Sequence, residues 1–324
     1  MYSEEKIKQA CSVDIVDYCM ENGISVQSDT ERYYRLIDHD SCVIDRKKNA
    51  FFWNSRGVSG NIINFVREYE GLTFKETVEK ILRGKYEENA NVFFSNEPFV
   101  YSSENEVANF DKARNYLVNE RYIDKDLVDS LHNKGLIKQD KHNNVLFLWK
   151  DYENIMGCSE QGTINTNKYK HSTWKKIQKN STEKYGFNFM TGQPKHLKFF
   201  ESSIDALSYA TLNKDKITDT WFVSMEGLKH TTVFNYFIKA KEILKEVPDS
   251  VSLCVDNDPG GLEFLEKFKW LEVKRKDGST YDFAIDIPEK PYSVEKWDWN
   301  DQLKYIVKQK QLQNEKKLEY HFQR

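Results

Sequence analysis

Two apolar runs in the second half of the chain end in acidic residues. Glu201 follows the run 197–200, and Asp256 and Asp258 follow the run 251–255. Because open α/β sheets bind ligands at the carboxyl ends of their strands, we expect these carboxylates to meet at one edge. Converging carboxylates need a cation to offset their repulsion, and oxygen ligands without nearby Cys or His favour Mg²⁺ or Mn²⁺. The pattern therefore predicts a metal-dependent phosphoryl-transfer site.

Glu201 and Asp205 lie four residues apart across a predicted strand-to-helix junction. Glu201 would point into the site from the strand end, and Asp205 would face back toward it from the first turn of the helix. The alternative is a structural one, because an acid in the first turn of a helix also interacts favourably with the helix dipole.

Asp256 and Asp258 are separated by one residue, so an extended backbone places both carboxylates on the same face, as a metal pair requires. Gly260 and Gly261 follow, and their lack of a side chain would let the backbone approach a phosphate. The alternative is a polar turn that closes a buried strand, with Asp and Gly present for the turn itself.

A second acidic group lies near the C-terminus, flanked by two tryptophans. Asp298, Asn300 and Asp301 could add to the metal shell beside an aromatic clamp, or they could simply begin a helix. We retain all three as accessory candidates, together with Gly260 and Gly261.

The segment 164–186 contains six lysines and a single glutamate, interleaved with aromatic residues. Lysines that contact phosphates and rings that stack on bases are the combination used to bind single strands. A solvated loop is the alternative. The candidate residues for nucleic-acid or nucleotide binding are Lys168, Lys170, Trp174, Lys175, Lys176, Lys179 and Lys184.

Composition indicates a cytoplasmic multi-domain protein. The chain has 324 residues, of which 39% are hydrophobic and 14% aromatic, and this is enough for more than one core. Its net charge of −3 argues neither for nor against a nucleic-acid partner. The five cysteines are scattered without a Cys-x-x-Cys motif, which favours buried thiols in a reducing compartment. We find neither a signal-peptide pattern nor an apolar stretch of membrane-spanning length, and therefore expect no membrane partner.

Periodicity and composition divide the chain into five segments of an α/β multi-domain protein. Residues 1–84 form a small domain, 85–108 an acidic linker, 109–194 an α+β domain, 195–290 a parallel sheet flanked by helices, and 291–324 a helical tail. In the fourth segment we expect strands near 197–200, 221–225, 251–255 and 283–287, and helices near 203–213, 231–246 and 261–269. Helices are also expected at 12–22, with Ser12 as a possible N-cap, at 73–82, 111–120 and 124–134, and from residue 301.

The acidic motifs resemble those of the toprim domain, which bacterial primases, topoisomerases and related nucleases share. Glu201-x-x-x-Asp205 followed by Asp256-x-Asp258 carries the resemblance, and it is most similar to toprim proteins of plasmids and integrative conjugative elements of Gram-positive bacteria. In those proteins a domain of unassigned function precedes toprim. The segments similar to these proteins are 116–117, 144–147, 157, 161–163, 185–187, 224–228 and 299–301.

The N-terminal segment resembles the one-His, three-Cys zinc ribbon of bacterial primases with its metal removed. Two of the cysteines would fall at Trp53 and Arg56, and His39 with Cys42 cannot complete the four ligands of a structural zinc site. We therefore expect a zinc-free domain that is stabilised by the packing of Phe51, Phe52 and Trp53.

The resemblance implies a primase-like nucleotidyltransferase that uses Mg²⁺ or Mn²⁺ and acts on single-stranded DNA with nucleoside triphosphates, in the replication or transfer of a mobile element. Glu201 would be the general base or acid, and Asp256 and Asp258, with Asp205, would hold the metal. A helicase or relaxase of the same element is a possible partner. Two alternatives stay open: a toprim nuclease that uses the same acids, and a non-catalytic DNA-binding adaptor of a conjugation or replication complex.

Overall fold

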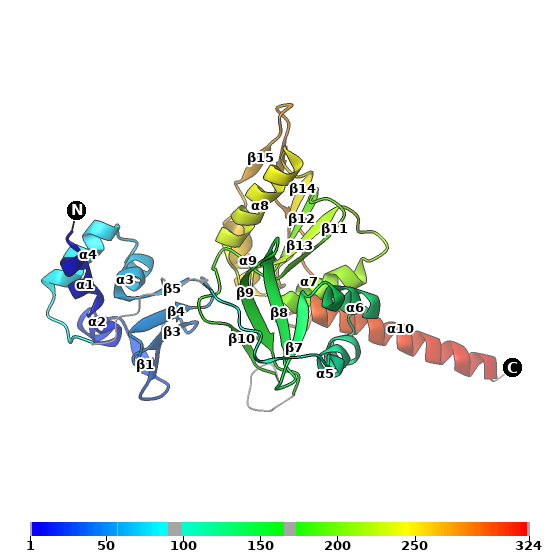
Figure 1. Ribbon diagram of the computed structural model, residues 1–324, viewed down its shortest axis with the longest axis horizontal. Helices are drawn as coiled ribbons and strands as arrows, with labels where there is room; N and C mark the ends of the chain where they lie inside the picture. Colours follow the sequence, from blue (N-terminus) through cyan, green and yellow to red (C-terminus); the bar gives the residue numbers. More distant parts are fainter. Residues whose placement is uncertain (1, 57, 90–98, 165–172, 323–324) are drawn as a thin grey trace. The chain divides into compact units, whose positions relative to one another are not determined.

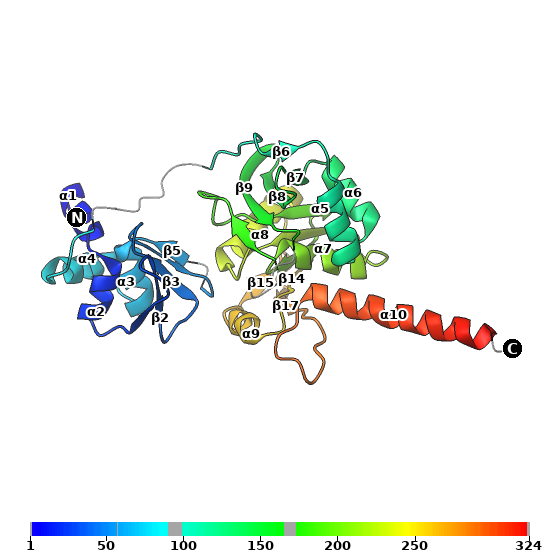
Figure 2. The same ribbon diagram turned by 90° about the horizontal axis from the view of Figure 1, so that it is seen from below.

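The computed structural model describes residues 2–56, 58–89, 99–164 and 173–322, without the side chains of residues 4 and 315–322. The chain divides into two compact units, Met1–Glu97 and Pro98–Arg324, which are described separately (Figures 1 and 2). Within the described ranges, no helix combines the length and the apolar character needed to cross a membrane.

The first unit is a five-stranded antiparallel sheet packed with helices. Its strands pair in chain order, and its elements are α1 (Glu4–Cys11), α2 (Ile15–Glu21), β1 (Val26–Ser28), β2 (Tyr33–Leu36), β3 (Cys42–Asp45), β4 (Ala50–Trp53), β5 (Val58–Gly60), α3 (Ile62–Glu70) and α4 (Phe74–Arg83). The helix expected at 12–22 begins instead at Ile15, because Asp14 is the N-cap and accepts from the Asp17 amide. Ser12 follows the preceding helix α1, which the sequence analysis missed.

Stacked side chains fill the corner where the resemblance places two zinc-ligand positions. The Arg56 guanidinium lies 3.8 Å from the centre of the Trp53 ring, and the His39 ring packs 4.9 Å from it on a tilted plane. Phe51 and Trp53 are buried in the core of this unit, and Phe52 is partly buried. Packing of the kind expected from the sequence is therefore present, and the absence of zinc stays a prediction.

The described ends of the predicted linker 85–108 pack onto the two units. The Glu87 carbonyl accepts from the Asp14 amide at 2.9 Å in the first unit. In the second unit, β6 (Glu106–Val107) pairs with β7 (Ile137–Asp140). The described parts of the predicted linker are therefore folded against the unit that each belongs to.

The second unit contains two five-stranded sheets. The first is antiparallel throughout, in the order β10-β9-β8-β7-β6, with β8 (Val145–Asp151), β9 (Asn154–Gln161) and β10 (Lys175–Ile177). Two helical segments accompany it, α5 (Asp111–Asn115) and α6 (Lys125–Asn133). The helix expected at 111–120 changes to a π-helix, η1, over Tyr116–Glu120.

The second sheet has the order β11-β13-β12-β14-β17 and is parallel except for the edge strand β11. Its strands and those of a small hairpin are β11 (Asn188–Thr191), β12 (His196–Phe200), β13 (Thr220–Ser224), β14 (Ser250–Leu253), β15 (Glu272–Lys274), β16 (Thr280–Asp282) and β17 (Ala284–Ile285). The helices are α7 (Ser203–Leu212), α8 (His230–Leu244), α9 (Pro259–Glu266) and α10 (Trp299–Phe322). Strand–helix alternation predicted the parallel strands, whereas β11 and the β15–β16 hairpin were missed.

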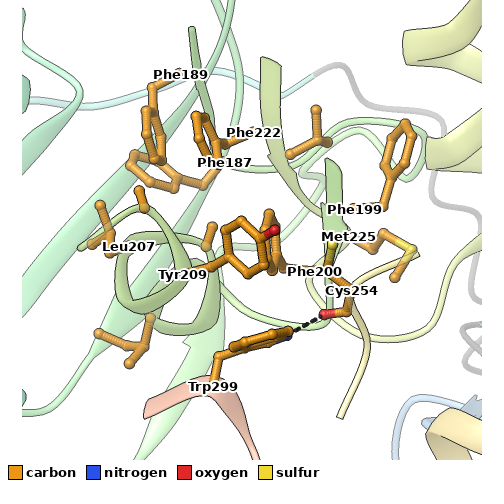
Figure 3. Close-up of a cluster of buried hydrophobic side chains, with 14 of the residues drawn as sticks. Phe187, Phe189, Phe199, Phe200, Leu207, Tyr209, Phe222, Met225, Cys254 and Trp299 are labelled. Atoms are coloured by element: carbon orange, nitrogen blue, oxygen red, sulfur yellow. Dashed lines mark hydrogen bonds between the residues drawn. The ribbon is translucent and has the colours of Figure 1, made fainter. Parts of the chain in front are cut away.

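A row of aromatic rings joins both sheets of the second unit to its C-terminal helix, and Figure 3 shows the part of it from Phe187 to Trp299. Successive rings lie within 6.3 Å of one another in the order Phe147, Phe187, Phe189, Phe222, Phe200, Tyr209 and Trp299. The two sheets therefore share one hydrophobic core. The domain boundary expected near residue 194 lies inside this unit. The division of the unit into two domains stays a prediction.

Trp299 anchors the start of α10. Its ring and that of Tyr209 are nearly perpendicular, with their centres 4.7 Å apart. Its indole Nε1 donates to the Cys254 carbonyl at 3.0 Å (Figure 3). Beyond this anchor, α10 projects away from the sheet (Figure 1).

We expect unfolding of the first unit to be insensitive to zinc chelation, because stacked side chains occupy the corner of the expected site. Circular dichroism during heating, with and without 1,10-phenanthroline, would measure this. A clear fall in the unfolding temperature with the chelator would contradict the zinc-free interpretation. Trp53→Ala serves as the positive control, and loss of a buried tryptophan should cost about 3–5 kcal/mol.

Trp299→Ala should destabilise the second unit by about 3–5 kcal/mol, because it removes a buried ring and leaves the Cys254 carbonyl without its donor. Urea unfolding followed by circular dichroism would test this. Trp270→Ala is the matched control, since that ring is 86% exposed and its loss should change stability by less than about 0.5 kcal/mol. Equal effects of the two substitutions would contradict the anchoring role.

Candidate metal centre at the carboxyl edge of the parallel sheet

Three neighbouring parallel strands deliver acidic side chains to one edge. Phe199 of β12 is in register with Val223 of β13 and with Leu253 of β14, so the three strands end at the same level. Glu201 directly follows β12, and Asp256 lies three residues beyond the end of β14. This register brings the acids to the same edge of the sheet, as the sequence predicted.

Asp205 is a buried acid that the helix does not need as a cap. Ser202 is the N-cap of α7, and its side chain accepts from the Asp205 amide at 3.3 Å and hydrogen-bonds to the Asp205 carboxylate. The side chain of Asp205 is almost fully buried, and its Oδ1 has no hydrogen-bond partner in the described part of the chain. Capping therefore does not account for this carboxylate.

Asp256 and Asp258 differ in how much of their hydrogen-bonding capacity is used. Asp258 is the N-cap of α9, since its Oδ1 accepts from the Gly261 amide at 2.9 Å, and Lys296 lies 3.4 Å from its Oδ2. Asp256 Oδ1 is buried, with no partner among the described residues. A role in the turn thus accounts for one carboxylate oxygen of Asp258. It does not account for the burial of the Asp256 carboxylate.

Gly261 is required by the turn itself. A Cβ at this position would lie 2.1 Å from the Asp256 carbonyl oxygen, so a side chain cannot be accommodated without moving the backbone. At Gly260 a Cβ would make an ordinary 3.4 Å contact with Asp258. The close approach of backbone to phosphate that the sequence suggested for both glycines stays a prediction.

The acids raise one another's pKa. Burial raises the pKa of Asp256 well above its ordinary value, and the negative charges of Asp205 and Glu201 add to the effect. Burial also raises the pKa of Asp205 to about 8, with a further contribution from Asp298. Burial raises the pKa of Glu201, although the positive charge of Lys175 opposes this rise. Five carboxylates therefore interact at this edge: Glu201, Asp205, Asp256, Asp258 and Asp298.

The three accessory candidates near α10 have different environments. Asp298 belongs to the acidic cluster and also accepts from the Asp301 amide at 2.6 Å. Asn300 is buried, and its side chain accepts from Arg121 and donates to the Arg121 carbonyl and to Ser208. Burial raises the pKa of Asp301, with Lys304 and Arg121 opposing the rise. Asn300 therefore joins α10 to η1 and α7 and has little capacity left for a ligand.

Among the described basic-segment candidates, Lys175 interacts with the acids, since its positive charge opposes the rise in the pKa of Glu201 and Asp205. Lys168 and Lys170 lie outside the described residues. Trp174 packs against Gly162, where a Cβ would lie 2.8 Å from the indole ring. Lys176 lies 3.7 Å from Glu160, Lys184 lies 6.0 Å from the centre of the Tyr185 ring, and Lys179 is exposed.

The sequence analysis missed one acid of this edge, Glu226. It lies two residues beyond the end of β13, whereas Glu201 directly follows β12, and the Gly227 amide donates to the Glu201 carbonyl at 2.8 Å. Glu226 is buried, and its Oε2 has no hydrogen-bond partner in the described ranges. The rule that singled out the other acids, a carboxylate directly after a buried strand, applies here too.

Comparison with known proteins places this edge in a recognised domain. Residues 199–303 match the family described as Toprim-like, and residues 115–194 match a family described as a protein of unknown function, DUF3991. The uncharacterized protein pXO2-78 of Bacillus anthracis is 54% identical over 316 residues, which cover 96% of this chain and 92% of that protein. This chain belongs to the family of that protein. Its C-terminal part contains a Toprim-like domain built on a parallel sheet.

Solved primase structures are among the more distant likenesses. The zinc-binding and RNA polymerase domains of the Aquifex aeolicus primase give a TM-score of 0.34 at 14% identity, over 97% of this chain and 85% of that one. The primase fragment of the bacteriophage T7 primase-helicase protein gives 0.38 at 15% identity, over 63% and 77%. These scores are too low to establish a common fold.

The donor set fits a hard divalent cation. The side chains offer carboxylate oxygen atoms, and three of the buried oxygens, on Asp205, Asp256 and Glu226, lack partners among the described residues. Burial, together with neighbouring negative charges, raises the pKa values of Glu201, Asp205 and Asp256. Within the described ranges, however, no three His, Cys, Asp or Glu side chains already form a ligand set.

The raised pKa of Asp205 predicts that stability falls as the pH rises. Between the ordinary value of 3.8 and about 8 the folded protein holds a proton that the unfolded chain has lost, so the free energy of unfolding should decrease across this range. Asp205→Asn removes the titrating group and should flatten the decrease. Urea unfolding of both proteins near pH 5 and near pH 8 would measure the difference.

Mg²⁺ should increase the free energy of unfolding more near pH 8 than near pH 5, because cations bind the deprotonated carboxylates.

The same pH dependence of stability in Asp205→Asn and in the unsubstituted protein would contradict the assignment of the titration to Asp205.

Proposed function

We propose that this protein is a primase-like nucleotidyltransferase that acts on single-stranded DNA with Mg²⁺ or Mn²⁺. One observation carries the proposal: the Toprim-like domain gathers buried carboxylates, three of which have an oxygen without a partner among the described residues. Unpaired buried carboxylates are costly, so a site that keeps them indicates a bound cation.

Asp205, Asp256 and Asp258 would hold the cation. Their oxygens come from two neighbouring strand ends, and Asp258 is oriented by its bond to the Gly261 amide. Asp298 would add negative charge from the start of α10. When bound, the cation would neutralise phosphate charge and orient the reacting groups.

Glu201 would accept or return the proton of the attacking 3′-hydroxyl. Burial raises the pKa of this carboxyl group and brings it closer to the working pH, which improves a general base or acid. Lys175 would contact phosphate oxygens at the border of the site. The remaining lysines of the basic segment and Trp174 would guide the template.

A role in a mobile element is supported by the family, because the B. anthracis relative is encoded on a plasmid. A helicase or relaxase of the same element is the partner that this context suggests. The N-terminal unit would correspond to a primase zinc ribbon without its metal, with Trp53 and Arg56 at two former ligand positions.

Asp256→Asn combined with Asp258→Asn should reduce primer synthesis on single-stranded DNA at least about 100-fold, because several kcal/mol of charge stabilisation are lost. Asparagine at 258 can still accept from the Gly261 amide, so the fold should be retained. The measurement is the incorporation of labelled ribo- or deoxyribonucleotides, with circular dichroism as the check on folding.

Asp277→Asn is the matched control, since Asp277 only caps its own exposed turn through Ser279. Full synthesis by the double variant would refute the proposal. Cleavage of labelled DNA without nucleotides would instead favour the nuclease. Salt-sensitive DNA binding by a protein that does not bind Mg²⁺ would favour the adaptor.

A further inference from the structure

Glu226 lies on the flank of the acidic edge that faces the antiparallel sheet. Its strand β13 is the parallel neighbour of β12, and the ladder continues past the strand ends, since the Met225 amide donates to the Phe200 carbonyl at 2.7 Å. The next amide-to-carbonyl contact joins Gly227 to Glu201. Glu226 is thus the neighbour of Glu201 across the sheet.

Three constraints fix the Glu226 side chain. Its Oε1 accepts hydrogen bonds from the hydroxyls of Ser203 and Ser224, the latter at 3.0 Å. Its backbone has φ of 51°, in the left-handed region that few residues other than glycine adopt. Residues held in such conformations concentrate at functional sites, where the surrounding structure maintains them.

The second oxygen of Glu226 faces a lysine from the other sheet. Oε2 is buried without a hydrogen-bond partner in the described chain, and Lys175 Nζ of β10 lies 4.0 Å from it. The Glu226 side chain is 0% exposed, whereas that of Lys175 is 43% exposed. The carboxylate therefore holds an ammonium group that solvent and a ligand can still reach.

Lys175 also acts electrostatically on the acidic cluster, since its charge opposes the rise in pKa of both Glu201 and Asp205. Lys229 is a second cation near Glu226, but burial lowers the pKa of its ammonium group. Lys175 is therefore the accessible positive charge of this pair.

We propose that Glu226 is a positioning residue that holds Lys175 beside the carboxylates, so that the lysine contacts the phosphate tail of a nucleotide. This inference rests on the proposed function and deepens it by naming a residue pair for the triphosphate. Carboxylates repel phosphate, so a cation fixed at their border assists binding. A glutamate that orients a phosphate-binding lysine is an established arrangement in phosphoryl transfer.

The test is a double-mutant cycle on the binding of inorganic pyrophosphate in the presence of Mg²⁺, measured by calorimetry with the full chain. Lys175→Met keeps the aliphatic stem and should weaken binding about 10-fold or more. Glu226→Gln keeps an acceptor for the two serines, removes the charge, and should weaken binding about 3- to 10-fold. The double variant should bind within about 2-fold of Lys175→Met, because Glu226 acts through the lysine.

The matched control is Lys195→Met, because Lys195 is similarly exposed at 46% and pairs with Asp219 at 2.9 Å. It should leave pyrophosphate binding unchanged. A labelled single-stranded oligonucleotide distinguishes the other source of phosphate: a loss of oligonucleotide binding with unchanged pyrophosphate binding would overturn the assignment to a nucleotide tail. Additive losses in the double variant, wild-type affinity in Glu226→Gln, or no pyrophosphate binding by the unsubstituted protein would also overturn it.

Primer-synthesis kinetics separate positioning from structure. Glu226→Gln should raise the KM for nucleotides more than it lowers kcat, and it should leave the unfolding temperature and Mg²⁺ binding intact. Non-additive pyrophosphate binding without any primer synthesis would refute the proposed function and support this pair. Primer synthesis together with additive losses of pyrophosphate affinity would support the proposed function and refute the role of this pair.

Discussion

Burial of several like charges at one edge of a parallel sheet is the constraint on which the rest of the second unit depends. Burial raises the pKa values of Glu201, Asp205 and Asp256, and the negative charges of neighbouring carboxylates raise them further. Such a cluster is tolerated because the strands beneath it are in register and packed with large aromatic side chains. Among the described residues, Lys175 and Lys229 lie near Glu226, and Lys296 lies beside Asp258. A cluster of this kind is well suited to a divalent cation and its phosphate ligand.

The C-terminal segment completes this edge from far along the chain. The Trp297 carbonyl accepts from the Asn257 amide at 2.8 Å, and Trp299 donates to the Cys254 carbonyl, so both flank the turn that carries Asp256 and Asp258. Asn300 then joins α10 to Arg121 of the N-terminal part of the unit. The acids are therefore positioned by contacts with α10 as well as by their own strands. The antiparallel sheet and α10 belong to the same hydrophobic core.

Sequence patterns predicted the parts of the site that follow local rules. A carboxylate directly after a buried strand is expected at the carboxyl edge, and this rule found Glu201, Asp256 and Asp258. The rule also applies to Glu226, but the Glu-Gly pair after β13 looks like an ordinary turn, and its partners Ser203 and Lys175 are distant in sequence. Ser12 was chosen as a cap because its residue type suits that role, while Asp14, two residues later, forms the hydrogen bond. Caps of this kind are decided by backbone geometry, which residue type alone does not specify.

The sequence by itself determined the class of the fold and the chemistry of the donors, because strand–helix alternation and carboxylate type are local properties. It could not determine which of the acids lack hydrogen-bond partners, since partnering depends on strand register and on residues that are distant in the sequence. Tertiary structure decided that the Asn300 side chain bonds to Arg121 and Ser208, and that Lys175 lies 4.0 Å from the buried carboxylate of Glu226. These outcomes follow from long-range packing. The energy of a charged side chain depends on its burial and on its charged or hydrogen-bonding neighbours, and the folded chain decides both.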